Sequence, residues 1–248
     1  MLKYLLVLLL SFSMAQAIIT IVPVELGKKP GVSGKLQGSS ERKKGNTDTN
    51  YYSAGLRLQY DNNSSYALWS DFTGNYGEAN GEENANKTYG HIRYIHTLYN
   101  KSFNWESFVQ AETNKFTKID EKYLVGAGLR YNLLGSEYGD LFFGLGGFHE
   151  NISYTTTVDP DETNFRMNSY LAYALKFGKD AELAYVLYYQ PNTESFSDYI
   201  MSNALSIKIH VYKKLFLSFI IYYDEDSDPA KDVKKYDYTQ KTSFIWEF

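Results

Sequence analysis

The chain ends in the nine residues QKTSFIWEF, at positions 240–248, and this stretch decides the fold class. Phe244, Trp246 and Phe248 occupy alternate positions, with polar side chains such as Glu247 between them. Alternation at every second residue predicts a β-strand with one apolar and one polar face. A helix would not separate the two sets, because its side chains repeat every 3.6 residues.

The terminal Phe, with aromatic residues at alternate positions before it, resembles the C-terminal β-signal of bacterial outer-membrane proteins. The barrel-assembly machinery reads that signal, so we assign Phe244, Trp246 and Phe248 to it. The alternative is an ordinary edge strand, whose exposed backbone would invite aggregation. We therefore predict an all-β fold, a transmembrane antiparallel up-and-down β-barrel.

The N-terminus has the pattern of an export signal. Lys3 precedes the apolar run Tyr4–Phe12, which is too short to span a bilayer, and Ala15–Ala17 reads A-x-A. We predict a signal peptide at 1–17, cleaved after Ala17, rather than an uncleaved anchor helix. Residues 18–30 are then a periplasmic segment or lie in the barrel mouth, and residues 31–248 form the barrel.

The same period of two continues from residue 31 to the end, interrupted by turn residues. Aromatic residues stand near both ends of several segments, as girdles at two membrane interfaces would. The connections alternate between short and longer polar ones, and Glu78–Asn86 is one of the longer loops. An even number of strands puts both termini on the periplasmic side. The twelve predicted strands are 31–41, 49–60, 65–77, 87–99, 103–114, 119–132, 140–157, 164–176, 181–190, 199–212, 215–224 and 236–248.

Composition excludes several classes of protein. The 248 residues include 24 Tyr, 15 Phe and 3 Trp but no Cys, so disulfides, thiolate metal sites and Cys nucleophiles are excluded. A formal charge of -4 argues against nucleic acid as a partner. The mean hydropathy of -0.41 is too polar for a helical membrane protein. It is compatible with strands that turn only every second side chain to lipid.

If the apolar faces meet lipid, the opposite faces line the lumen. They carry both signs of charge, with basic residues in excess. Such charges form a salt-bridge network that fills the barrel, or they line a watery passage that favours anions. Twelve strands lie between packed eight-stranded and open sixteen-stranded barrels, so strand number does not decide between them. The predicted inward-facing residues are Lys35, Arg57, Asp71, His91, Arg93, Glu106, Glu112, Lys122, Arg130, Arg166, Lys176, Glu182, Lys208 and Lys241.

Catalytic and metal patterns are weak, and we predict no catalytic residue, cofactor or metal. His149 and Ser153 share a face of one predicted strand, but four residues of strand separate them by about 13 Å. That is too far for a nucleophile and its base. The acidic run Asp224–Asp228 begins like a calcium loop, but Pro229 stands where the turn Gly belongs and Lys235 where the bidentate Glu belongs.

Two further motifs resemble a known family. Gly45–Thr49 (GNTDT) joins the first two predicted strands, and Tyr123–Tyr131 (YLVGAGLRY) follows the aromatic strand Trp105–Glu112. With the terminal Phe, they resemble the YdiY-like family, a domain of unknown function whose members are often described as salt-induced outer-membrane proteins. The resemblance covers about 31–248. It implies an outer-membrane barrel and supplies no substrate or catalytic residue.

These observations predict a monomer in the bacterial outer membrane, in contact with lipid and lipopolysaccharide and assembled by the barrel-assembly machinery. Three roles follow. An envelope-maintenance or stress-related protein has its lumen filled by paired charges. A porin-like channel passes small solutes, with a preference for anions. A lipid-modifying enzyme, the least favoured, needs Ser or His beside a base near the outer rim.

Overall fold

The computed structural model describes residues 30–43, 49–100, 102–178 and 180–248, and the predicted signal peptide lies outside them. The described residues form twelve strands and one short 3₁₀ helix, η1 (Lys115–Thr117). The strands are β1 (Gly31–Lys43), β2 (Thr49–Asp61), β3 (Tyr66–Ala79), β4 (Glu82–Asn100), β5 (Phe103–Asn114), β6 (Ile119–Gly135), β7 (Gly139–Tyr154), β8 (Glu162–Phe177), β9 (Ala181–Pro191), β10 (Tyr199–Tyr212), β11 (Leu215–Asp226) and β12 (Tyr236–Glu247). In the described part of the chain, no helix is long and apolar enough to cross a membrane.

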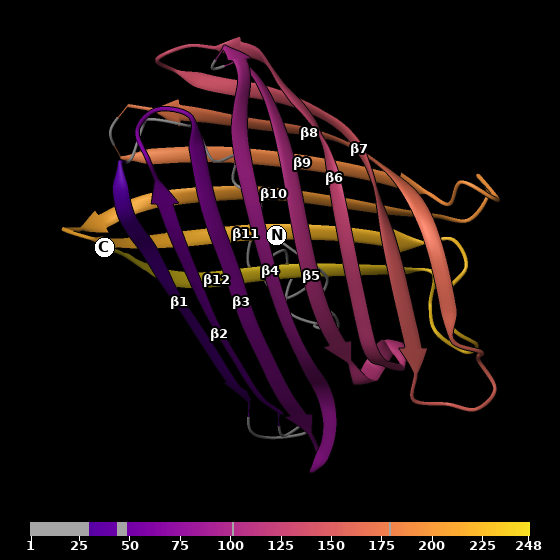
Figure 1. The fold of residues 1–248 in the computed structure, drawn as a ribbon. Coiled ribbons are helices and arrows are strands. Elements are labelled where there is room, and N and C mark those ends of the chain that lie inside the picture. Colours follow the sequence, from indigo (N-terminus) through magenta and orange to yellow (C-terminus); the bar gives the residue numbers. More distant parts are fainter. Residues whose placement is uncertain (1–29, 44–48, 101, 179) are drawn as a thin grey trace, which may run out of the picture.

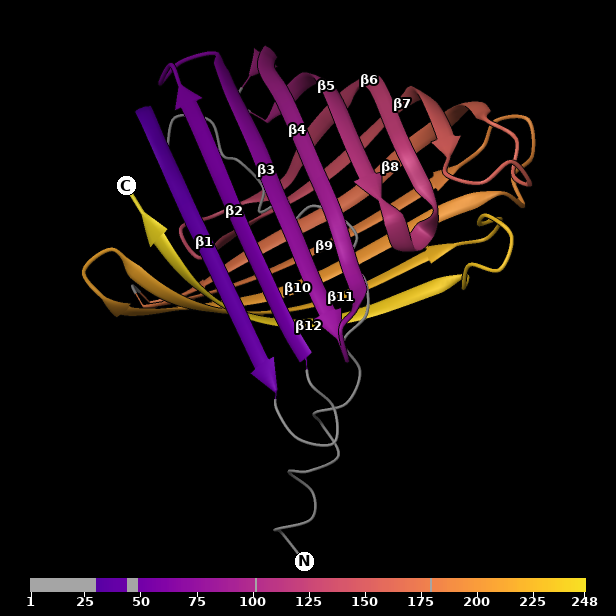
Figure 2. The same cartoon turned by 90° about the horizontal axis from the view of Figure 1, so that it is seen from below.

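Each strand pairs antiparallel with its neighbours in sequence, and β1 pairs with β12, so the sheet is closed (Figures 1 and 2). The prediction of a twelve-stranded up-and-down barrel is confirmed. Both the start of β1 and the end of β12 lie at one rim, which we name the terminal end. The opposite rim, which holds the turns after the odd-numbered strands, is the loop end.

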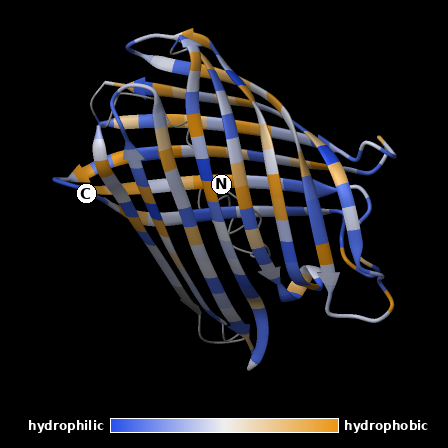
Figure 3. Ribbon diagram, in the orientation of Figure 1, coloured by the Kyte–Doolittle hydropathy of each residue, from blue (hydrophilic) through white to orange (hydrophobic). Residues whose placement is uncertain are grey.

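Hydropathy alternates along the strands, as Figure 3 shows. One face of each strand carries mostly apolar side chains that project outward and stay exposed, Val125 by 58% for example. Aromatic residues contact one another around the outside near the rims. At the terminal end Tyr66 lies 6.0 Å from Tyr60 and 5.7 Å from Tyr94, centroid to centroid. At the loop end the Tyr223 and Tyr236 rings are 6.2 Å apart. This outer surface is apolar in the middle and aromatic at both rims, which suits a bilayer.

Connections at the terminal end are short, such as the two residues between β10 and β11. Those at the loop end include seven residues between β7 and β8 and nine between β11 and β12. One prediction was wrong, because the long loop expected at Glu78–Asn86 is a two-residue turn. Asn80 and Gly81 both have positive φ, 52° and 81°, which a tight hairpin turn requires. β3 and β4 therefore extend further at the loop end than predicted.

The closing seam between β1 and β12 is short. Its ladder holds four pairs, from Lys35 opposite Glu247 to Gly38 opposite Phe244. Phe248 adds two backbone hydrogen bonds with Gly34, of 2.9 and 3.0 Å. In contrast, β1 pairs with β2 along its full length. Toward the loop end the two seam strands diverge without further ladder pairs, as the view in Figure 2 shows.

Several inward-facing glycines make room for large side chains, and Gly144 on β7 provides a test. A Cβ at Gly144 would overlap the ring of Tyr170, whereas a Cβ at Gly74 on β3 has no atom within 4 Å. We expect Gly144→Ala to lower the free energy of unfolding by about 1–3 kcal/mol, because the packed interior has no space for the methyl group. Gly74→Ala, the matched control, should change it by less than about 0.5 kcal/mol. Urea unfolding of the refolded barrel measures both, and equal values would contradict this packing.

Candidate functional site: the barrel interior

Apolar side chains from several strands meet inside the terminal half of the barrel. Trp69 of β3 is 1% exposed and packs in a cluster with side chains from β4, β7, β8 and β9. The cluster joins opposite walls of the barrel, since β5 and β6 separate β4 from β7 in the sheet. Its members are Ala67, Trp69, Ile95, Phe142, Tyr170, Ala172, Val186 and Tyr188.

Arg93 of β4 stands beside this cluster and carries the first buried ion pair. Its guanidinium lies 3.3 Å from the Glu106 carboxylate and 5.6 Å from the centre of the Trp69 ring. Glu106, 1% exposed, also accepts a hydrogen bond of 3.0 Å from the hydroxyl of Tyr170 across the lumen. His91 stacks on Trp69 with the ring centroids 4.9 Å apart. Charge and ring stacking are therefore combined in one packed layer.

Glu150 of β7 is the centre of a second ionic group, nearer the loop end. It is 0% exposed. Its carboxylate accepts a hydrogen bond of 2.5 Å from Arg166 and forms an ion pair of 2.9 Å with Lys122. Arg166 also donates to Asp198, in the connection between β9 and β10, at 2.8 Å. One buried carboxylate thus forms ion pairs with two cations, and Arg166 connects the barrel wall to the β9–β10 connection. Lys87 and Glu112 form a further buried pair, 2.7 Å apart.

A third ionic group lies between β1–β3 and β9–β12. Arg57 and Asp71 form a two-pronged pair with distances of 2.6 and 2.5 Å. Lys208 lies 3.2 Å from Glu182 and 3.0 Å from Glu247, and Lys35 lies 3.3 Å from Glu247. Because Glu247 is on β12 and Lys35 on β1, this group also bridges the seam.

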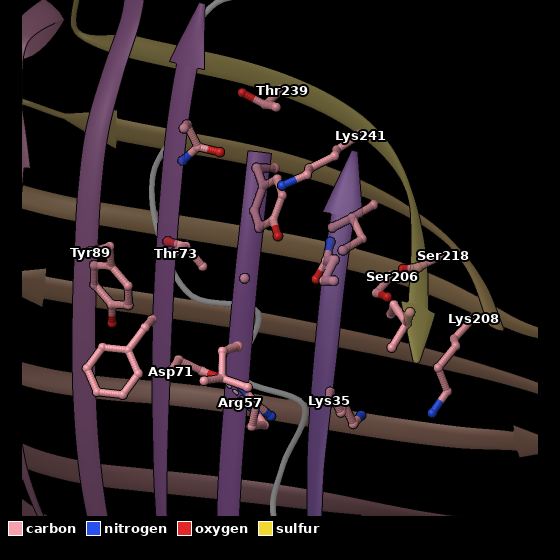
Figure 4. A pocket seen from close by; sticks show the side chains of 18 of the residues that line it. Lys35, Arg57, Asp71, Thr73, Tyr89, Ser206, Lys208, Ser218, Thr239 and Lys241 are labelled. Carbon is pink, nitrogen blue, oxygen red and sulfur yellow. Dashed lines mark hydrogen bonds and ion pairs between the residues drawn. The ribbon is translucent and has the colours of Figure 1, made fainter. Parts of the chain in front are cut away.

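A cavity of about 130 Å³ adjoins the third group (Figure 4). Four cationic side chains line it, those of Lys35, Arg57, Lys208 and Lys241. Hydroxyl groups of Thr73, Ser206, Ser218 and Thr239 complete much of its polar wall. A second, smaller cavity of about 40 Å³ lies between β4 and β10, near Arg93 and Lys122. The described interior thus combines packed ionic groups with at least two polar cavities, the larger of which adjoins the third group.

The structure places every charged residue of the predicted inward-facing set on the inner faces of the strands. Nine of these residues are Lys or Arg and four are acidic. Sequence reasoning missed at least seven acids and one base, Lys87, on the same faces, so the predicted basic excess does not hold for the inner faces that the structure describes. Strand parity alone would have found most of them. These acids are Asp61, Asp140, Glu150, Asp224, Asp226, Asp237 and Glu247.

Three connections contact one another at the loop end. The Asp159 carboxylate, between β7 and β8, accepts hydrogen bonds of 2.8 Å from the Lys231 backbone N–H and from the Thr156 hydroxyl. These donors stabilise the charged form and lower the pKa of Asp159. Lys118, in the connection between β5 and β6, donates a hydrogen bond to the backbone carbonyl of Lys231. The three connections partly cover the rim of the barrel.

The residues considered for catalysis and metal binding are not assembled into a site. His149 is exposed on the outer face of β7. Over the described residues, no group of three His, Asp or Glu side chains could hold a metal ion. The Asp226 carboxylate instead accepts a hydrogen bond of 3.0 Å from the Asp228 backbone N–H, an ordinary loop contact.

Closed antiparallel strands, an apolar outer band with aromatic rims and an ionic interior define a β-barrel of the outer-membrane type. Two solved structures show the same fold. One is the COG4313 outer membrane channel from Pseudomonas putida F1, at 10% identity and a TM-score of 0.58, covering 94% of this chain and 100% of that one. The other is the NanC porin, at 8% identity and a TM-score of 0.51, covering 86% and 97%.

The family model described as "Protein of unknown function, DUF481" matches residues 39–248, and the chain belongs to this family. The predicted membership of an unknown-function family is thereby confirmed, whereas the YdiY-like name and the salt-induced description remain predictions. No curated protein matches the sequence.

Proposed function

We propose that this protein is a monomeric outer-membrane barrel with a closed interior and a role in maintaining the envelope, rather than a transport protein. The observation that carries the proposal is the apolar cluster around Trp69, which joins opposite walls in the terminal half. The buried ion pairs support it, because pairing lets charges fill the interior without a column of water. Export by the predicted signal peptide and folding by the barrel-assembly machinery are part of the proposal.

The outer surface supports the predicted partners, lipid and lipopolysaccharide. Exposed apolar residues cover the middle of the strands and aromatic residues lie near both rims. With the terminal end in the periplasm, the longer connections face outward, as in barrels of this type. No enzymatic step is part of the proposal.

Conductance in planar bilayers tests the closed interior. We expect the refolded protein to give no steady single-channel current. A triple variant, Trp69→Ala with Phe142→Ala and Tyr188→Ala, should give measurable current, because it removes three large members of the cluster. Current from this variant would also show that inserted barrels are detected in the recording. Steady currents from the unmodified protein, at the level of the triple variant, would reject a closed interior.

A porin-like channel is the second candidate, and the cavity beside the seam favours it. Four cations in its wall would suit an anionic solute. The same bilayer recording separates the two candidates, since a channel requires current through the unmodified protein. If current appears, its reversal potential in a salt gradient shows whether anions are preferred.

A further inference from the structure

Lys241 is a cation on the inner face that has no carboxylate partner among the described residues. Around the cavity, the four cations Lys35, Arg57, Lys208 and Lys241 face three carboxylates, those of Asp71, Glu182 and Glu247. The first three cations are each within 3.3 Å of one of these carboxylates. Among the described residues the Lys241 ammonium has one partner, the Ser53 hydroxyl at 2.5 Å, and no carboxylate. A cation enclosed in a barrel without a counter-ion is costly, so an anion bound there would be stabilised.

Two buried hydroxyl groups of the same region also lack hydrogen-bond partners in the described structure. Ser218 lines the cavity and is 1% exposed, and its Oγ has no hydrogen-bond partner in the described structure. The same is true of the buried Oγ of Ser39, which stands opposite Ser53 in the β1–β2 ladder. Buried hydroxyls normally find a partner. An oxyanion could accept a hydrogen bond from a hydroxyl and from the ammonium.

The position of Lys241 relative to the seam gives such an anion two routes. Lys241 belongs to the part of β12 that has no ladder pair with β1. To reach Ser53 on β2, its side chain crosses the inner side of β1, the strand between them in the sheet. Lys241 therefore lines the cavity from the part of β12 that has no ladder pair with β1. In Figure 4 it lies near Thr239, on the side of the cavity away from Lys35 and Arg57.

We propose that this cavity binds a phosphate-type oxyanion, held by Lys241 and completed by the hydroxyls of the cavity wall. The site goes beyond the proposed envelope role and does not depend on conductance. The oxyanion is free in solution and enters through the interior, or it belongs to a membrane lipid and enters where β1 and β12 diverge. The two sources share one chemistry and differ in their route.

Calorimetric titration with inorganic phosphate tests the site in the refolded barrel at low salt. We expect one phosphate per barrel. Lys241→Gln should weaken binding at least about tenfold, since a charge-assisted hydrogen bond is lost. Lys214→Gln, at an exposed lysine in the turn after β10, is the matched control and should bind as the unmodified protein does. Heat-dependent gel mobility shows whether each variant is folded.

Native mass spectrometry tests the lipid-borne source. We expect one phosphatidylglycerol to be retained in preference to phosphatidylcholine, and lost in Lys241→Gln. The titration with inorganic phosphate separates the two sources, because a free oxyanion binds in the absence of lipid, whereas a lipid-borne one is retained as phosphatidylglycerol.

Retention of either ligand that depends on Lys241 supports the site and identifies its source. The proposal is overturned if a folded barrel binds neither phosphate nor phosphatidylglycerol. It is equally overturned if Lys241→Gln binds both as tightly as Lys214→Gln. Because conductance is not measured in these experiments, their failure leaves the closed-interior proposal to its own test.

Discussion

Deleting Phe248 should remove most of the folded protein, reducing the heat-modifiable form at least about fivefold when the chain is expressed or refolded. The residue supplies two backbone hydrogen bonds to Gly34 in a seam that has only four ladder pairs. Each backbone bond contributes about 1 kcal/mol, and losing both leaves an unpaired edge at the point of closure. The terminal aromatic is also the last residue of the predicted assembly signal.

Two variants separate closure of the barrel from reading of the signal. Gly34→Val leaves the C-terminal sequence intact, but its side chain would overlap the Phe248 ring, so we expect a similar loss. Phe177→Ala removes another exposed aromatic residue, at the end of β8 and away from the seam, and serves as the control. Gel mobility with and without heating measures all three. Normal yields of the folded form after deletion of Phe248 would contradict this account of the seam.

Glu150→Gln should lower the free energy of unfolding by about 3–5 kcal/mol, the largest effect we expect from one side chain. The substitution keeps the shape but removes the carboxylate that pairs with both Lys122 and Arg166. Arg166 retains Asp198, whereas Lys122 keeps no carboxylate among its ion pairs in the described structure. The cost arises mainly from leaving that buried charge unpaired.

Denaturant unfolding in detergent measures this effect. Glu194→Gln, in the exposed connection between β9 and β10, is the control and should change stability by less than about 0.5 kcal/mol. Adding Lys122→Met to Glu150→Gln should restore part of the loss, because it removes the cation that was left unpaired. A loss below about 1 kcal/mol for Glu150→Gln alone would show that the interior is wet enough to screen these charges.

The local alternation of polar and apolar residues predicted most of the fold. Alternation located all twelve strands, and their number and the connections placed both ends at one rim. The exception at Asn80–Gly81 has a local reason. The residues around the turn are polar, and a polar sequence does not show whether it pairs across a hairpin or forms a loop. The β3–β4 ladder continues past the pair Thr73 and Tyr89, beyond the part of each strand that would lie within the membrane.

Alternation also assigned side chains to the inner face, because parity is a local property of a strand. Alternation could not show which of these side chains contact one another. Arg166 pairs with Glu150 on the neighbouring strand and with Asp198 in a later connection, and Tyr170 reaches Glu106 across the lumen. Those contacts depend on register and on how far opposite walls approach each other. For that reason the sequence favoured a filled interior only slightly over a watery one.

By itself, the sequence determined that this chain is a barrel with a lipid-suited exterior and a charged interior, since both follow from a period of two repeated twelve times. Only the tertiary structure decided that an apolar cluster around Trp69 joins opposite walls in the terminal half, that the seam is short, and that Lys241 has no carboxylate partner among the described residues. These are properties of distances between strands far apart in the chain. Such distances are set when the sheet closes, and no single strand encodes them.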